Sequence, residues 1–122
     1  MERKICIIET DDALRGLLKD VLQTEGFEVE DFCNAYPLFE VNRGWPDLFL
    51  IEIDLESING LEICRWIKTH EETQHIPVVL ICGSPELEVL ANDAKADGYI
   101  SKPIVLPELL RILYSNQHVT VL

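Results

Sequence analysis

Five segments of the chain have the patterns expected of β-strands. Continuous apolar runs at 4–8, 48–51 and 76–81 are typical of strands buried on both faces of a parallel sheet. Segment 27–32 alternates apolar and polar residues, which indicates a strand near the sheet edge with one wetter face, and 99–101 is a short last strand. Acidic residues follow the first and the third of these strands directly.

Helical spacing of apolar residues follows each predicted strand. The clearest stripe begins soon after the first strand and consists of Leu14, Leu17, Leu18, Val21 and Leu22. Further helices are predicted at 61–70, at 85–94 and from Pro107 onward, with a weaker one at 36–43. This alternation predicts an α/β fold, a doubly wound three-layer sandwich around a five-stranded parallel sheet with right-handed crossovers.

In such a sandwich, ligands bind where the carboxyl ends of the strands diverge. Glu9, Glu52, Cys82 and Lys102 follow or end four of the predicted strands, so we expect them at this edge of the sheet. Any functional site is therefore expected there.

The composition is that of one globular domain. The chain has 122 residues, 48% hydrophobic and 26% charged, which suffices for one core and leaves no room for a second. Ten Lys and Arg against 22 Asp and Glu give a net charge of −12, which disfavours direct binding to nucleic acid or anionic membranes. No apolar run approaches the roughly 20 residues that span a bilayer, and no signal-peptide pattern is visible, so we expect a cytoplasmic protein.

The residues most often used in catalysis and metal binding form no recognisable motif. The four cysteines contain no C-x-x-C pair, and the three histidines lack metal-ligand spacing. No glycine-rich phosphate-binding motif is present either. We therefore expect no catalytic residue, no cofactor and no structural metal.

Several short motifs resemble the receiver domain of bacterial two-component response regulators. They are the acidic stretch after the first strand, Pro46-Asp47, Asn59-Gly60-Leu61-Glu62, Ile76-Pro77-Val78 and Tyr99-Ile100-Ser101-Lys102-Pro103. A Lys-Pro pair just beyond a short fifth strand is the most specific of them. The resemblance covers nearly the whole chain and implies a (βα)5, flavodoxin-like fold with strand order 2-1-3-4-5.

The resemblance also implies a phosphorylation pocket. In the family, an aspartate ending the third strand accepts a phosphoryl group from a histidine kinase, with Mg²⁺ held partly by two acids after the first strand. A hydroxyl residue after the fourth strand and a lysine after the fifth then bind the phosphoryl oxygens. The phosphoacceptor position falls on Glu52 and the two acid positions on Glu9 and Thr10, whereas the switch and phosphate-contact positions are Cys82, Tyr99, Lys102 and Pro103.

Three of these positions depart from the family pattern. Glu52 replaces the aspartate and carries its carboxylate about 1.5 Å further from the strand, a large displacement for in-line transfer. Thr10 offers a neutral hydroxyl where Mg²⁺ prefers an anionic oxygen, and Cys82 is a weak hydrogen-bond donor. We therefore expect a phosphorylation-independent receiver in which Glu52 pairs with Lys102, either locked in one state or merely inert.

Two alternatives remain open at this point. A receiver that still autophosphorylates would use Asp54 or Glu52 as acceptor, with Mg²⁺ held by Glu9 and its neighbours in an acidic pocket that includes Thr10 and Asp11. Weak metal binding would involve Glu9, Glu52 and Asp54. A flavodoxin-like cofactor binder is disfavoured because the loop after the first strand is acidic and would repel an anionic cofactor.

The expected partner is another protein. In the family, the fourth helix, the fifth strand and the fifth helix form the contact face, which corresponds here to 85–94, 99–101 and the helix from Pro107. A second copy of the chain is the other candidate partner for this face. Lys95 stands where a helix-ending glycine is common. We place the receiver-like domain at 1–115 and a tail or linker start at 116–122.

Overall fold

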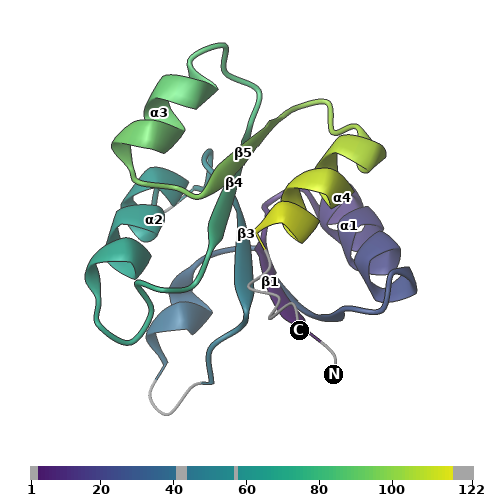
Figure 1. The fold of residues 1–122 in the computed structure, drawn as a ribbon, viewed down its shortest axis with the longest axis horizontal. Helices are drawn as coiled ribbons and strands as arrows, with labels where there is room; N and C mark the ends of the chain where they lie inside the picture. The colour runs from purple at the N-terminus through teal and green to yellow at the C-terminus, as the bar shows by residue number, and fades with distance from the viewer. Residues whose placement is uncertain (1–2, 41–43, 57, 117–122) are drawn as a thin grey trace.

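The computed structural model describes residues 3–40, 44–56 and 58–116. Five parallel strands lie in the order β2-β1-β3-β4-β5, which confirms the predicted fold (Figure 1). The strands are β1 (Lys4–Ile8), β2 (Glu28–Phe32), β3 (Leu48–Glu52), β4 (Val78–Cys82) and β5 (Gly98–Ser101). The helices are α1 (Asp12–Thr24), α2 (Gly60–Thr69), α3 (Leu87–Asp93) and α4 (Leu106–Ser115). None of the helices in the described part of the chain has the length and apolar character needed to cross a membrane.

The weak helix predicted at 36–43 is shorter than expected. Only a 3-10 turn, η1 (Tyr36–Phe39), forms there, and residues 41–43 lie outside the described part. Pro37 occupies the first turn, where its missing N–H costs nothing, and Glu40 has an extended backbone that ends the turn. The family's fourth and fifth helices are therefore α3 and α4 of this structure.

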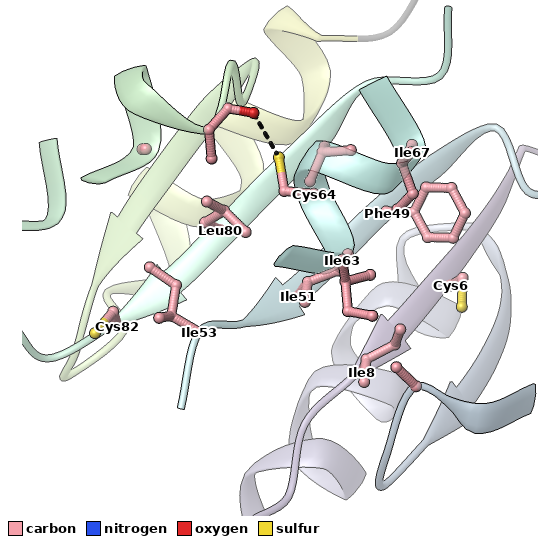
Figure 2. Packing of buried hydrophobic residues seen from close by; sticks show 14 of the residues in the cluster. Cys6, Ile8, Phe49, Ile51, Ile53, Ile63, Cys64, Ile67, Leu80 and Cys82 are labelled. Atoms are coloured by element: carbon pink, nitrogen blue, oxygen red, sulfur yellow. Dashed lines mark hydrogen bonds between the residues drawn. The ribbon is translucent and has the colours of Figure 1, made fainter. Parts of the chain in front are cut away.

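Each face of the sheet has its own core because strand side chains alternate between the two faces. Cys6, Phe49 and Leu80 point toward α2 and α3, and Figure 2 shows them packed with Ile63 and Cys64 of α2. The Cys64 thiol also donates a hydrogen bond to the Ala94 carbonyl oxygen, at 3.4 Å. The opposite face is covered by α1 and α4, whose buried side chains are Leu18, Leu22, Leu109 and Leu113.

Helix α1 begins where the acidic stretch after β1 supplies a cap. The Asp11 carboxylate accepts a hydrogen bond from the backbone N–H of Leu14, at 3.1 Å, which satisfies one of the free donors at the helix start. Gly26, with φ of +97°, lets the chain turn back into β2 at the other end. Asp11 is exposed and serves the helix, so only Glu9 of this stretch is fully buried.

Lys95 ends the α3 segment in a backbone conformation that favours glycine. Its φ is +63°, a left-handed conformation that costs a residue with a Cβ about 1–2 kcal/mol. We expect Lys95→Gly to raise the free energy of unfolding by about 0.5–1 kcal/mol, because glycine avoids this cost but loses more backbone entropy. Urea denaturation measures the change, and Lys95→Ala is the control, since alanine keeps the Cβ and should give no gain.

Candidate functional site

Three charged side chains meet at the carboxyl ends of the strands. Glu9 follows β1 directly, Glu52 ends β3 and Lys102 follows β5 directly. Because side chains alternate along a strand, each shares its face with the residue two positions earlier. Those residues are all buried in the core beneath α1 and α4: Ile7, Leu50 and Ile100. The three charges therefore lie just beyond the end of this apolar core.

The Lys102 ammonium is shared between the two carboxylates. Its Nζ lies 3.1 Å from Glu9 Oε1 and 3.1 Å from Glu52 Oε2, and the two acidic side chains are only 1% and 4% exposed. Neither oxygen accepts a well-directed hydrogen bond among the described residues, so these contacts are ion pairs. The remaining oxygens accept backbone N–H groups, of Asp11 for Glu9 at 3.2 Å and of Asp54 for Glu52 at 3.3 Å.

One ammonium between two buried carboxylates leaves an excess of negative charge. Burial raises the pKa of Glu52, and the nearby Glu9 charge raises it further, against the lowering effect of Lys102. Burial lowers the pKa of Lys102, but its contacts with Glu9 and Glu52 outweigh this, so the net shift is upward. The lysine therefore stays charged at neutral pH, while ionisation of Glu52 lowers the stability of the folded state.

This cost predicts how stability depends on pH. The folded-state pKa of Glu52 lies above its ordinary value of 4.5. Its contribution to the free energy of unfolding is therefore greatest below pH 4.5 and is lost as the pH rises through the raised pKa. We expect Glu52→Gln to unfold at a higher temperature than the wild type at pH 8, with the difference narrowing toward pH 4.5. Thermal unfolding across this range measures it. The control is Glu28→Gln at an exposed position on β2, and lower stability of Glu52→Gln at pH 8 would contradict the prediction.

The thiol of Cys82 contacts Asp54, which lies two residues beyond Glu52. Cys82 Sγ lies 3.5 Å from Asp54 Oδ2, to which it donates, and it accepts the Ser84 backbone N–H at 3.4 Å. Burial raises the pKa of the Cys82 thiol, so the thiolate that a nucleophile needs is disfavoured. Asp54 is exposed, and its oxygen, the Cys82 sulfur and one oxygen of Glu52 lie within 4.8 Å of one another.

These residues do not fit the Mg²⁺ that the family implies. Mg²⁺ needs several hard oxygen ligands in an octahedral arrangement. Glu9 and Glu52 are already paired with an ammonium, Cys82 offers a soft sulfur, and Thr10 presents a hydroxyl in place of a carboxylate. The Thr10 Oγ1 atom is buried and has no hydrogen-bond partner among the described residues. The described residues of this site therefore lack the set of free, hard oxygen ligands that Mg²⁺ requires.

The other predicted positions lie around the charged cluster. Tyr99 is half-buried and packs against the core beneath α2 and α3, on the sheet face opposite to Lys102. Pro103 is exposed and follows Lys102 through a cis peptide bond. Thus Glu9, Glu52 and Lys102 come into contact, whereas Tyr99 lies on the other face.

The contacts that two residues make in support of the site were not predicted from the sequence. Arg15 of α1 donates through Nη1 to the Glu9 carbonyl oxygen, at 2.8 Å, and through Nε to Asp31, at 3.1 Å. Gly60 donates its backbone N–H to the Ile53 carbonyl oxygen, at 2.8 Å, which brings the start of α2 against the end of β3. Arg15 is a lone cation among acids near the start of α1, a signal that could have marked it as a partner of that loop.

Comparisons with known proteins agree with this geometry. The model of the response regulator receiver domain matches residues 5–114. The polar-differentiation response regulator DivK of Brucella anthropi is 29% identical over 118 residues, covering 94% of this chain and 96% of DivK. A putative response regulator from Chloroflexus aurantiacus J-10-fl superposes with a TM-score of 0.88 at 23% identity, covering 94% of this chain and 97% of that one. For a CheY-like receiver domain protein from Methanospirillum hungatei JF-1, the TM-score is 0.82 at 29% identity, with 94% and 93% covered.

A doubly wound sheet with acids and a lysine at the carboxyl ends of its strands defines a signalling module of the receiver class. The chain belongs to the response regulator receiver domain family, since that model matches 5–114 of its 122 residues. It is therefore a receiver domain of two-component signalling.

Proposed function

We propose that this receiver domain accepts no phosphoryl group and works as a phosphorylation-independent protein-interaction module. The observation that carries the proposal is the contact of Lys102 with Glu52, at 3.1 Å. In the family, this lysine binds the phosphoryl group on the acceptor aspartate. Here a carboxylate of the chain itself already holds the ammonium, so the pocket contains its counter-charge before any phosphate arrives.

Glu9 and Cys82 also support this proposal. Phosphoryl transfer depends on positioning and on neutralising the charge of the transferring oxygens. Glu9, Glu52 and a single ammonium already carry excess negative charge, and an incoming phosphoryl group would add to it. Cys82 replaces the hydroxyl donor, and its thiol is engaged with Asp54. An acyl phosphate on Glu52 would therefore form without its usual cation and hydrogen-bond support.

The surface formed by α3, β5 and α4 is the contact face that we propose for a protein partner. Val89 of α3 is 70% exposed, and Val105, which caps α4, is 54% exposed. Exposed apolar side chains of this size suit burial against a protein. A second copy of the chain is the alternative partner, and a cross-linking experiment with Val89→Asp distinguishes a dimer through this face from a monomer.

The test is intact mass after incubation with phosphoramidate or acetyl phosphate and Mg²⁺. We expect no added phosphoryl group on the wild type, whereas the double variant T10D/E52D should gain one. The substitutions restore the anionic ligand and the shorter acceptor, and T10D alone and E52D alone serve as controls. A phosphoryl group on wild-type Glu52 or Asp54 would overturn the proposal. If the double variant stays unmodified, these two positions alone do not silence the chemistry.

A further inference from the structure

Both tryptophans of the chain lie in one aromatic cluster away from the charged pocket. Trp45 and Trp66 are the two tryptophans in the sequence, and their ring centroids are 6.1 Å apart. The centroids of the Phe39 and Trp66 rings are 5.2 Å apart in an edge-on arrangement, and those of Trp66 and His70 are 4.1 Å apart. Phe39 is 44% exposed, so the cluster is open to solvent.

The cluster lines a cleft that has carboxylates on its walls. The cleft has a volume of about 480 Å³ and lies where η1, the residue Trp45 and the C-terminal end of α2 meet. Its three acidic residues, Glu40, Glu71 and Glu72, are all exposed. Among the described residues that line this cleft there is no Lys or Arg. We call this feature the aromatic cleft.

The position of the aromatic cleft separates it from the proposed function. Trp45 precedes β3 in the chain, whereas Glu52 ends that strand, so the two sites lie at opposite ends of the sheet. Helix α2 begins at Gly60, against the backbone of Glu52, and its last turns carry Trp66 and lead to His70, which line the cleft. An occupant of the aromatic cleft would therefore leave the Lys102 pocket untouched.

The chemistry of the walls selects a flat cation. Tryptophan rings attract cations over their faces, and arginine is the side chain found there most often. The planar guanidinium also stacks on aromatic rings and matches the two oxygens of a carboxylate. The Trp45 indole N–H already points to Glu72 Oε2, at 3.4 Å, which places one carboxylate beside the ring. An anion would be repelled by the carboxylates that line the cleft.

We propose that the aromatic cleft binds an arginine side chain from a basic segment of a partner protein. The charge of the cleft complements such a segment, and the net charge of −12 on the whole chain favours its approach. The cleft is built from three separate parts of the chain, and five of its lining residues are exposed, which leaves it accessible to a segment of another protein: Phe39, Glu40, His70, Glu71 and Glu72. The cleft would thus recognise the arginine through its guanidinium group, which would contact both the aromatic rings and the carboxylates.

The tryptophans provide a local readout of binding. A peptide of sequence Ser-Arg-Ser-Arg-Ser, with blocked ends, is titrated into the full chain while tryptophan fluorescence is followed. Two matched peptides carry lysine or citrulline in place of arginine, the latter being a neutral side chain of the same shape. We expect saturable binding of the arginine peptide, weaker binding of the lysine peptide and none of the citrulline peptide. The Trp45 indole N–H signal in an NMR spectrum should shift in the same titration.

A pair of charge-matched variants tests the walls of the cleft. E71Q/E72Q removes two carboxylates from the cleft, whereas D20N/E28Q removes two exposed carboxylates, one on α1 and one on β2, outside both proposed contact surfaces. Both variants change the net charge equally, so steering by the whole protein is the same. We expect E71Q/E72Q to weaken binding of the arginine peptide about tenfold and D20N/E28Q to leave its affinity within about twofold of the wild type.

Three results would overturn the proposal. Equal binding of the citrulline peptide would show that the cation is not recognised, and equal weakening by the two variants would show that only net charge matters. If ethylguanidinium, a small cation, binds as tightly as the peptide, the cleft takes a small molecule and not a protein segment. Because the phosphorylation assay uses another pocket, either proposal can fail alone.

Discussion

Replacing Lys102 by methionine is expected to cost about 3–5 kcal/mol of the free energy of unfolding at pH 8. Methionine keeps an apolar chain of similar length but removes the only ammonium that contacts Glu9 and Glu52 among the described residues. Both carboxylates are almost fully buried, so the variant would hold two like charges without a partner. Urea denaturation at pH 8 measures the loss.

Two controls show whether charge is the cause. The loss in Lys102→Met should shrink as the pH falls toward 5, because protonation of Glu52, whose pKa is raised, relieves the repulsion. The triple variant E9Q/E52Q/K102M removes all three charges, so it should recover most of the lost stability. If Lys102→Met is as stable as the wild type at pH 8, the ion pairs contribute nothing measurable to the fold.

Gly60→Ala is expected to destabilise the protein by more than about 4 kcal/mol or to prevent folding, because the backbone leaves no space for a methyl group. A Cβ at Gly60 would overlap the Glu52 carbonyl oxygen and lie 2.7 Å from Ile53 Cα. Both obstacles are backbone atoms, one in the last residue of β3 and one in the residue after it, so α2 would have to move away from the strand that carries Glu52. Circular dichroism and thermal unfolding report the change.

Gly16→Ala is the matched control for this prediction. Gly16 is exposed in the middle of α1, and a Cβ there meets nothing within 4 Å. Alanine should therefore stabilise the protein by about 1 kcal/mol, the usual difference in helix propensity. Equal behaviour of the two variants would contradict the assignment of the Gly60 effect to a steric contact.

The strands were predictable because their patterns leave little choice. A run such as 48–51 is too short for a helix and too apolar for a surface, and the alternation of strands and helices then requires a parallel sheet. The strand order came from the family resemblance, and the structure confirms it. The turn at 36–39 was overestimated because apolar spacing alone does not separate a 3-10 turn from a helix.

The charged cluster was only partly predictable. The ends of parallel strands meet at one edge, so the arrival of Glu52 and Lys102 there follows from the topology. The contact of Lys102 with Glu9 as well depends on which face each side chain takes, which requires the register of β1 against β3. The close approach at Gly60 was not predicted either, since the sequence pattern shows a turn and not the strand behind it.

Lys102 and the two carboxylates that it contacts belong to the same polypeptide, so the lifetime of these contacts differs from that of a phosphorylated state. An acyl phosphate is formed by transfer from a phosphoryl donor and is lost by hydrolysis, so the phosphorylated state of a receiver has a limited lifetime. The Glu52 carboxylate is a permanent part of the protein and no phosphatase removes it. Its contact with Lys102 forms whenever the chain folds. Under the proposed function, the output of this protein follows the number of folded copies, beginning with synthesis and ending with degradation.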